Sequence, residues 1–186
     1  MSDAPVVYFD DFISEPIRDA AFLMLRDGLA WERRETAPRS EYWTNTFERD
    51  YTYGEGPGRR TYEARPSHPF IDVCRDQIEV EAGVRLEGCF LNLYHNGSDG
   101  LGWHADDDPK IDHNRPIAVI TLGEGRDIAF KRNVKGAHPE RMFLESGSLL
   151  IMRPGMQQTH LHAIPKVEGR DIGPRISLTF RGLVPA

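Results

Sequence analysis

The sequence has few cysteines, no long apolar segment and no excess of basic residues. Its 186 residues include only Cys74 and Cys89, which form no Cys-x-x-Cys pair, so we expect buried thiols in a reducing compartment rather than a disulfide. No apolar run approaches the length of a membrane span, and the first residues lack the basic and apolar regions of a secretory signal. We therefore expect a cytoplasmic protein with no membrane partner.

The net charge of −6 argues against a protein that coats nucleic acid non-specifically. The acidic residues are unevenly distributed, because five aspartates lie within one short segment, where a bound cation would offset part of their repulsion. These are Asp99, Asp106, Asp107, Asp108 and Asp112. The arginines are scattered along the chain and leave room for local basic patches.

The chain length fits a single domain, residues 1–186. Ser14, followed by Glu15 and Pro16, predicts a helix that ends near Gly28. A second helix is expected after Ser67, with its end at Gly83. From residue 86 onward we expect short strands separated by turn signals. The predicted strands are Cys89–Tyr94, Trp103–Asp106, Ile117–Leu122, Asp127–Lys131, Ser148–Arg153, Thr159–Ala163 and Arg175–Arg181.

This order predicts a mainly β fold of the α+β class, a double-stranded β-helix or jelly-roll core with two N-terminal helices packed on one face. Residues 86–186 would form the core and residues 1–85 the helices and a lid facing the substrate. Residues 38–66 mix aromatic and arginine side chains, which can stack on nucleobases. The alternative is an irregular β-hairpin whose aromatic residues cover the core. We expect a monomer.

Residues 92–108 are the segment around which the chain is organised. They predict a strand, a glycine-rich turn and a second strand that starts with His104-x-Asp106. Side chains at i and i+2 leave the same face of a strand, so both residues can reach one metal ion. A third ligand would be His160 or His162, between which strand geometry does not choose. Two histidines and one carboxylate form a facial triad that suits non-haem Fe(II). We expect Trp103, beside this triad, to lie in the core.

The C-terminal strand alternates strictly between polar and apolar residues. If its polar face points into the interior, Arg175 and Arg181 need a ligand, because buried unpaired cations are costly. A dicarboxylate meets that need, since guanidinium groups pair with carboxylates through two hydrogen bonds. The alternative is a surface strand whose polar face lies in water.

These residues belong to a longer series of motifs that follow one another between residues 35 and 183. The series is Asn92-Leu93-Tyr94, Gly97-x-Asp99, His104-x-Asp106-Asp107-Asp108, Gly123-x-x-Arg126-Asp127-x-x-Phe130, Gly147-Ser148-Leu149-Leu150-x-Met152, His162-Ala163-Ile164-Pro165 and Arg175-x-Ser177-x-Thr179-Phe180-Arg181. Taken together it resembles the AlkB family of Fe(II)- and 2-oxoglutarate-dependent dioxygenases, in particular the branch that repairs alkylated bases in duplex DNA. Pro38-Arg39 and Tyr51-Thr52-Tyr53 resemble the substrate-facing region of that family.

The resemblance implies that His104, Asp106 and His162 hold Fe(II), the His-Ala-Ile-Pro context favouring His162 over His160. It implies that Arg175 and Tyr94 bind the distal carboxylate of 2-oxoglutarate. The other residues implied to line the cosubstrate pocket are Asn92, Ser177, Thr179 and Arg181. Ser177 departs from the family, which often carries Asn there, so the resemblance leaves its contact with the cosubstrate open.

The implied activity is oxidative demethylation, or dealkylation, of N-alkylated bases in DNA, with RNA as a further candidate. It consumes 2-oxoglutarate and O2 and releases succinate, CO2 and formaldehyde. A base in a duplex must be flipped out to react. The implied substrate contacts are Tyr51 and Tyr53 for stacking, Asp107 and Asp108 for an exocyclic amine, and Arg39, Arg59, Arg60 and Arg141 for phosphates.

Three alternatives remain at this point. An AlkB-like hydroxylase of RNA, a protein or a small molecule would fit the acidic net charge. A non-catalytic nucleic-acid-binding module would have no need for the complete set of metal and cosubstrate residues. A zinc hydrolase would not explain the two arginines of the C-terminal strand.

Overall fold

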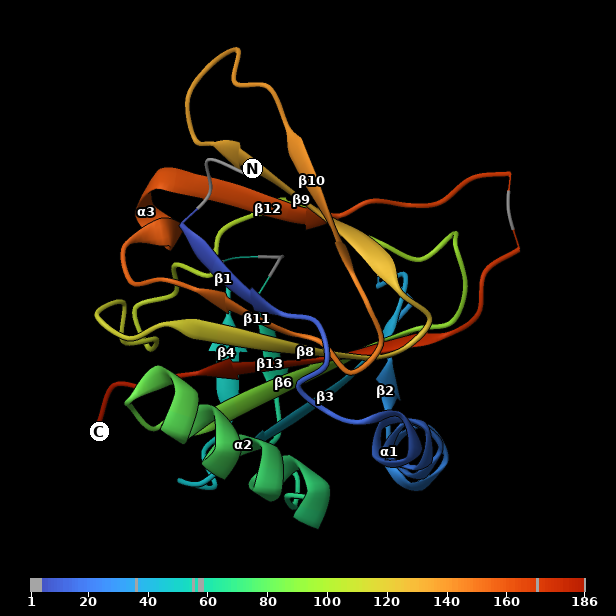
Figure 1. The fold of residues 1–186 in the computed structure, drawn as a ribbon. Coiled ribbons are helices and arrows are strands. Elements are labelled where there is room, and N and C mark those ends of the chain that lie inside the picture. Colours follow the sequence, from blue (N-terminus) through green and yellow to red (C-terminus); the bar gives the residue numbers. More distant parts are fainter. Residues whose placement is uncertain (1–4, 36, 55, 57–58, 170, 186) are drawn as a thin grey trace.

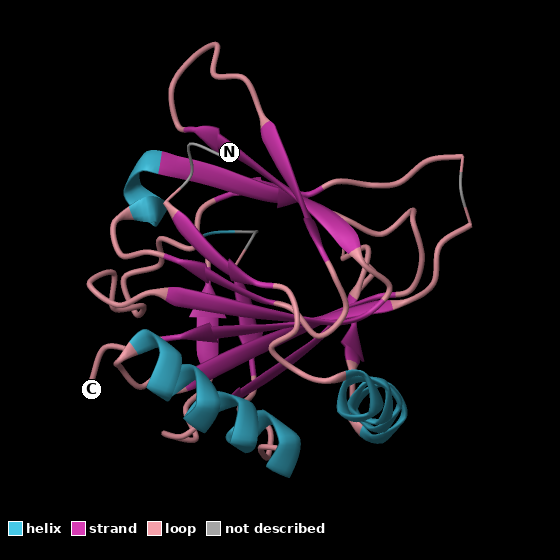
Figure 2. Ribbon diagram, viewed as in Figure 1, coloured by secondary structure: helices cyan, strands magenta, loops and turns pink. Residues whose placement is uncertain are grey.

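The computed structural model describes residues 5–35, 37–54, 56, 59–169 and 171–185. Two antiparallel sheets face each other, and Figure 1 shows β9, β10 and β12 on one side of the larger sheet and α1 and α2 on the other. Strands dominate the fold, as the magenta segments of Figure 2 show. The expected jelly-roll class, with two helices on one face, is confirmed.

The larger sheet has seven strands, all paired antiparallel. In spatial order they are β1 (Val6–Phe9), β11 (Leu149–Met152), β8 (Ile117–Gly123), β13 (Arg175–Arg181), β6 (Gly88–Tyr94), β3 (Ser40–Asn45) and β2 (Glu32–Arg33). The smaller sheet contains β10 (Glu140–Leu144), β9 (Arg126–Arg132), β12 (His160–Ile164) and β7 (Leu101–His104). A separate hairpin pairs β4 (Tyr51–Tyr53) with β5 (Arg60–Tyr62).

Both predicted helices are present, as α1 (Glu15–Gly28) and α2 (Pro69–Ala82). The N-cap of α2 is His68, whose Nδ1 accepts a hydrogen bond from the Phe70 amide at 3.2 Å. Gly83 ends α2 at a φ of 69°, a left-handed conformation that favours glycine. The short helix α3 (Met156–Thr159) was not predicted. Within the described residues, no helix has the length and apolar character needed to span a membrane.

Strand β13 has an apolar face and a polar face, and each is covered by a different layer of the fold. It lies between β6 and β8 in the middle of the larger sheet, and all seven of its residues are buried. Ile176, Leu178 and Phe180 join the core under the helices, where burial of each such side chain contributes about 1.5–3 kcal/mol. The polar residues leave the other face, toward the smaller sheet. Arg175 is 0% exposed, so the surface-strand alternative is wrong.

The structure corrects several boundaries. The strand expected at residues 103–106 is β7 (Leu101–His104), so Asp106 lies beyond its end. Trp103 is 40% exposed, so the expectation that it lies in the core is wrong. Strand β3 belongs to the larger sheet, which leaves only the β4–β5 hairpin of the 38–66 segment outside the two main sheets. Strands β1, β2 and β10 were not predicted.

Candidate metal centre and cosubstrate site

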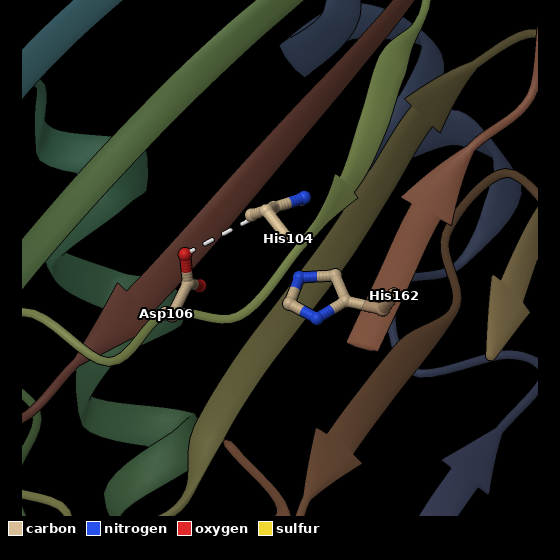
Figure 3. A group of neighbouring side chains, drawn as sticks. All are labelled: His104, Asp106 and His162. Atoms are coloured by element: carbon tan, nitrogen blue, oxygen red, sulfur yellow. Dashed lines mark ion pairs between the residues drawn. The ribbon is translucent and has the colours of Figure 1, made fainter. Parts of the chain in front are cut away.

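Three side chains from neighbouring segments converge on one point. His104, the last residue of β7, pairs across the sheet with His162 of β12, and their ring centroids are 4.2 Å apart. Asp106 follows two residues later, and ligand atoms of all three residues lie within 4.8 Å of one another. Figure 3 shows the three side chains around a common space. His160 lies two residues before His162 on β12, and its Nδ1 is 2.9 Å from Thr159 Oγ1.

The hydrogen bonds of His104 fix which nitrogen faces the other two residues. Its Nδ1 is 2.8 Å from the Gly102 carbonyl oxygen. A carbonyl only accepts, so Nδ1 carries the proton and Nε2 keeps its lone pair. Nε2 lies 3.8 Å from Asp106 Oδ1, on the side where a metal would bind. A backbone acceptor of this kind is a common way to orient a metal-binding imidazole.

Asp106 is held by two contacts from elsewhere in the fold. Arg181 Nη2 donates a 2.8 Å hydrogen bond to Oδ2, which leaves Oδ1 toward the histidines. The Asp106 amide donates to Gln157 Oε1 at 2.9 Å, so α3 helps to position a loop residue. No motif in the sequence pointed to Gln157.

The charges in this cluster favour metal binding. Burial raises the pKa of Asp106, but Arg181 and the two histidines more than offset this and bring it to about 2. Burial lowers the pKa of His162 to about 3, with His104 adding to the effect. A carboxylate and a neutral imidazole are the forms that coordinate a metal. His162 Nδ1 is buried without a hydrogen-bond partner among the described residues, and the N, N, O donor set fits a divalent transition metal.

The surroundings of Arg175 show whether the site suits a bound dicarboxylate. Its Nη2 donates to Thr121 Oγ1 at 2.9 Å, while Nε and Nη1 are buried with no partner among the described residues. Burial lowers its pKa to about 10, partly opposed by Tyr94, so the guanidinium stays charged at neutral pH. Unsatisfied buried donors are costly, and a bound carboxylate would satisfy them. The residues present therefore fit 2-oxoglutarate.

The other residues implied for the cosubstrate lie beside Arg175 through sheet register. Tyr94 is directly opposite Arg175, and Asn92 is opposite Ser177. Thr179 lies two residues further along β13 and, like Ser177, is buried. All of these side chains leave the same face of the larger sheet. The register alone thus gathers them between the sheets.

Arg126 is a buried residue to which we assigned no role from the sequence. Its guanidinium lies 5.4 Å from the Tyr94 ring, as does that of Arg175. It donates to the carbonyl oxygens of Asp99 at 2.9 Å and Pro165 at 2.6 Å. Arg126 therefore ties two loops together at the cosubstrate end. Its place in the β9 alternation with Ile128 and Phe130 was the available signal.

A cavity of about 380 Å³ adjoins the three candidate metal ligands, which we call the metal cluster, and His104 and Asp106 belong to its lining. Tyr51 and Tyr53 line it from β4, and Asp108 and Arg181 also belong to its lining. Tyr53 is 46% exposed, whereas Tyr51 is buried and packs against the Trp43 ring with centroids 5.2 Å apart. Among the sequence-derived substrate residues, Asp107 is exposed and absent from the lining.

A hydrogen-bonded network crosses this cavity wall. Arg39 donates from Nε to Asn92 Oδ1 at 2.6 Å and from Nη2 to Glu41 Oε1 at 2.7 Å. Tyr62 donates to Glu41 Oε2 at 3.1 Å. The Glu41 side chain is 0% exposed, and nothing in the sequence marked it out. The network joins the hairpin, through Tyr62, to Asn92, which the family resemblance implies for the cosubstrate pocket.

The remaining arginines suggested for phosphate contacts do not line one common hollow. Arg60 lines the cavity, and Arg59 lines a separate hollow beside Asp107 and Tyr53. Arg141, on β10, has a side chain that is 64% exposed and lies 3.6 Å from Asp127. The structure therefore does not gather these residues into one cluster.

Comparisons with known proteins bear on this site. A model of the 2OG-Fe(II) oxygenase superfamily matches residues 6–181. The chain is 29% identical over 155 residues to DNA oxidative demethylase ALKBH2 of Bos taurus, covering 77% of this chain and 55% of that protein. It is 31% identical over 186 residues to alpha-ketoglutarate-dependent dioxygenase alkB homolog 3 of Bos taurus, covering 94% and 64%. The chain thus spans less than two thirds of the length of either relative.

The fold also has a match among solved structures. The structure of OsALKBH1 superposes with a TM-score of 0.70 and covers 97% of this chain and 99% of its own. The sequence identity is 15%, so this likeness bears on the fold alone.

Proposed function

Because the chain belongs to the 2OG-Fe(II) oxygenase superfamily, and its resemblance to the AlkB family is confirmed, we propose that it removes alkyl groups oxidatively from N-alkylated bases in DNA. Membership of the superfamily implies Fe(II), 2-oxoglutarate and O2. The observation that carries the proposal is the group of three metal-binding side chains, held through Arg181 by the same strand, β13, that carries the buried Arg175 with its unpaired donors. Such a pairing suits a metal ion that shares its coordination with a dicarboxylate.

Each residue of the site has a role in this proposal. His104, Asp106 and His162 hold the metal, and Arg175 with Tyr94 binds the distal carboxylate. Arg181 keeps Asp106 ionised and fixes one of its oxygens. Bound iron and 2-oxoglutarate supply the oxidation by O2, one oxygen atom entering the alkyl group and the other entering succinate as CO2 leaves. The hydroxymethyl group then separates as formaldehyde and restores the base.

The size and lining of the cavity suit a single extruded base. Its volume of about 380 Å³ falls within the range of about 300–1,000 Å³ typical of small-molecule sites. Tyr53, exposed at the mouth, offers a stacking surface for an extruded base. Asp108, buried in the lining, offers an acceptor to an exocyclic amine. These contacts are part of the proposal.

The direct test supplies the protein with Fe(II), 2-oxoglutarate and oligonucleotides carrying N1-methyladenine, N3-methylcytosine or an etheno-adduct, in single- and double-stranded form. We expect succinate and formaldehyde in equal amounts from the methylated substrates. The matched variant is His104→Ala, which should abolish turnover and leave oligonucleotide binding nearly unchanged. Turnover only with RNA, a peptide or a small molecule would exclude the DNA assignment and retain the oxygenase. Activity that survives His104→Ala would contradict the assignment of His104 as a metal ligand.

A further inference from the structure

A second hollow, of about 350 Å³, lies next to the smaller sheet. Side chains alternate along a strand, so Trp103 leaves the face of β7 opposite to His104. Ala163 leaves the corresponding outer face of β12, opposite to His162. We call this hollow the Trp103 groove, because Trp103 and Arg141 flank a floor that includes Ala129 and Ala163.

The charge of the Trp103 groove differs from that of the whole protein. The chain carries a net charge of −6, yet the charged side chains that line the groove among the described residues, Arg141 and Lys166, are both cationic. Lys131 adds a third cation, with Nζ 4.5 Å from the centroid of the Trp103 ring. Arg141 faces Asp127 at 3.6 Å, but the Arg141 side chain is 64% exposed, and such surface pairs are weak. The groove therefore suits an anionic occupant.

The aromatic surface of the groove suits a flat occupant. Trp103 is 40% exposed, although tryptophan is highly buried on average. The floor residues Ala129 and Ala163 are small and leave space beside the indole. Aromatic surfaces flanked by cations are the common means by which proteins hold single-stranded nucleic acid, since bases stack on the rings and phosphates meet the cations.

The Trp103 groove adjoins the cavity beside His104 and Asp106, because Pro38 and Leu101 line both hollows. A nucleic-acid chain with one base in the cavity would have its neighbouring nucleotide near this shared wall. We propose that the Trp103 groove binds the nucleotide next to the extruded base, with its base on Trp103 and its phosphates on Lys131 and Arg141. This proposal rests on the proposed function.

The first test measures stacking on Trp103. Binding of a fluorescein-labelled, unmodified single-stranded oligodeoxynucleotide is followed by anisotropy. Trp103→Ala should weaken binding about 5-fold to 100-fold, the range expected for the loss of one stacked base. Trp103→Phe should bind within about 3-fold of the parent, because phenylalanine also stacks. Mn(II) binding by both variants verifies that neighbouring His104 still holds a metal.

A second reading of the same titration uses tryptophan emission. The chain has three tryptophans, of which Trp43 is 3% exposed. A base stacked on Trp103 should quench the emission of the parent protein, and Trp103→Phe should lose this quenching while keeping its affinity. Quenching of equal depth in both proteins would overturn the proposal.

The third test concerns the cations. Each phosphate contact to a single strand contributes about 0.7 to the slope of log affinity against log salt concentration. Arg141→Gln should lower that slope by about this amount and weaken binding several-fold. The control is Arg26→Gln in α1, on the far side of the larger sheet, which should change neither. Equal slopes for Arg141→Gln and the control would overturn the phosphate contact.

The remaining outcomes separate this inference from the proposed function. If the parent binds single strands through Trp103 but releases no succinate from methylated oligonucleotides, the groove stands and the dealkylase assignment fails. If turnover occurs but Trp103→Ala binds as tightly as the parent, the assignment stands and the groove fails. A dimer that dissociates on Trp103→Ala, measured by light scattering, would identify a second copy as the occupant and overturn the nucleic-acid proposal.

Discussion

The two ends of the candidate site are built differently. At the inner end, between the sheets, Asn92, Tyr94 and Arg175 lie on adjacent central strands, and each is at most 5% exposed. At the mouth, Tyr53 lies on a hairpin outside both main sheets and is 46% exposed, and Asp107 lies in a loop. The inner end is fixed by sheet register, whereas the mouth has few anchors. The two ends are nevertheless joined, because the Glu41 network links Tyr62 of the hairpin to Asn92 through Arg39.

The largest effect is expected at the inner end, from Arg175→Met. Loss of a buried charge partner costs about 2–5 kcal/mol, so the affinity for 2-oxoglutarate should fall about 30-fold or more. The same change removes buried donors that have no partner among the described residues. The cosubstrate-free variant should therefore unfold at the same temperature as the parent or higher.

Thermal unfolding with and without 2-oxoglutarate, on the Mn(II)-loaded protein, measures both quantities. The parent should be stabilised by the cosubstrate, and the variant should not. Arg26→Met, on the exposed face of α1, controls for the general loss of a surface charge. A variant that still gains stability from 2-oxoglutarate would show that Arg175 is not its carboxylate partner.

The inner end could be predicted from the sequence because its residues follow a period of two. The alternation in Arg175–Arg181 gave the polar face correctly, and the choice between a buried and a surface strand needed only the position of β13 between β6 and β8. Register then brought Tyr94 and Arg175 together. The choice between His160 and His162 came from the family resemblance, since both share one face.

The positions of residues held by long-range contacts could not be predicted in the same way. Asp106 lies beyond the end of β7, and its position depends on Arg181 and Gln157, which are 75 and 51 residues away in sequence. Glu41 reads as an ordinary strand carboxylate until Arg39 and Tyr62 are placed around it. Contacts between such distant, non-periodic residues leave no local pattern.

Glu41→Gln tests whether the two ends are connected. The neutral amide keeps the shape of the side chain but weakens the hydrogen bond from Arg39, which costs about 1.5–3 kcal/mol when one partner is charged. Because Arg39 also holds Asn92, we expect the KM values for both 2-oxoglutarate and the methylated oligonucleotide to rise about 10-fold. Steady-state kinetics with each substrate varied in turn measures the two values.

The matched variant is Tyr62→Phe, which removes the hairpin's hydrogen bond to Glu41 and keeps the Glu41 carboxylate. It should raise the KM for the oligonucleotide more than the KM for 2-oxoglutarate, since Arg39 and Asn92 keep their contacts. If Glu41→Gln altered only the oligonucleotide KM, the network would belong to the mouth alone.

Tyr53→Ala is expected to affect only the mouth. Loss of one stacking contact to a base costs about 1–3 kcal/mol, so the KM for a methylated oligonucleotide should rise about 5-fold to 100-fold. The affinity for 2-oxoglutarate should be unchanged, because Tyr53 lies on β4, outside the larger sheet that carries Arg175. Tyr53→Phe should restore most of the loss. An equal loss in both variants would assign the role to the hydroxyl group and not to the ring.

The smallest effect is expected from Ser177→Ala at the inner end. Ser177 is 4% exposed and lies between Asn92 and Thr121 across the two neighbouring strands. A neutral hydrogen bond contributes about 0.5–1.5 kcal/mol, so a direct contact with 2-oxoglutarate predicts an affinity loss of about 2-fold to 10-fold, measured by titration of the Mn(II)-loaded protein. Ser177→Asn provides the comparison, because the longer amide reaches further into the space between the sheets. If the alanine variant lost as much affinity as Arg175→Met, hydroxyl contacts would matter as much as charge for binding 2-oxoglutarate. The view that the buried arginine dominates binding at the inner end would then be wrong.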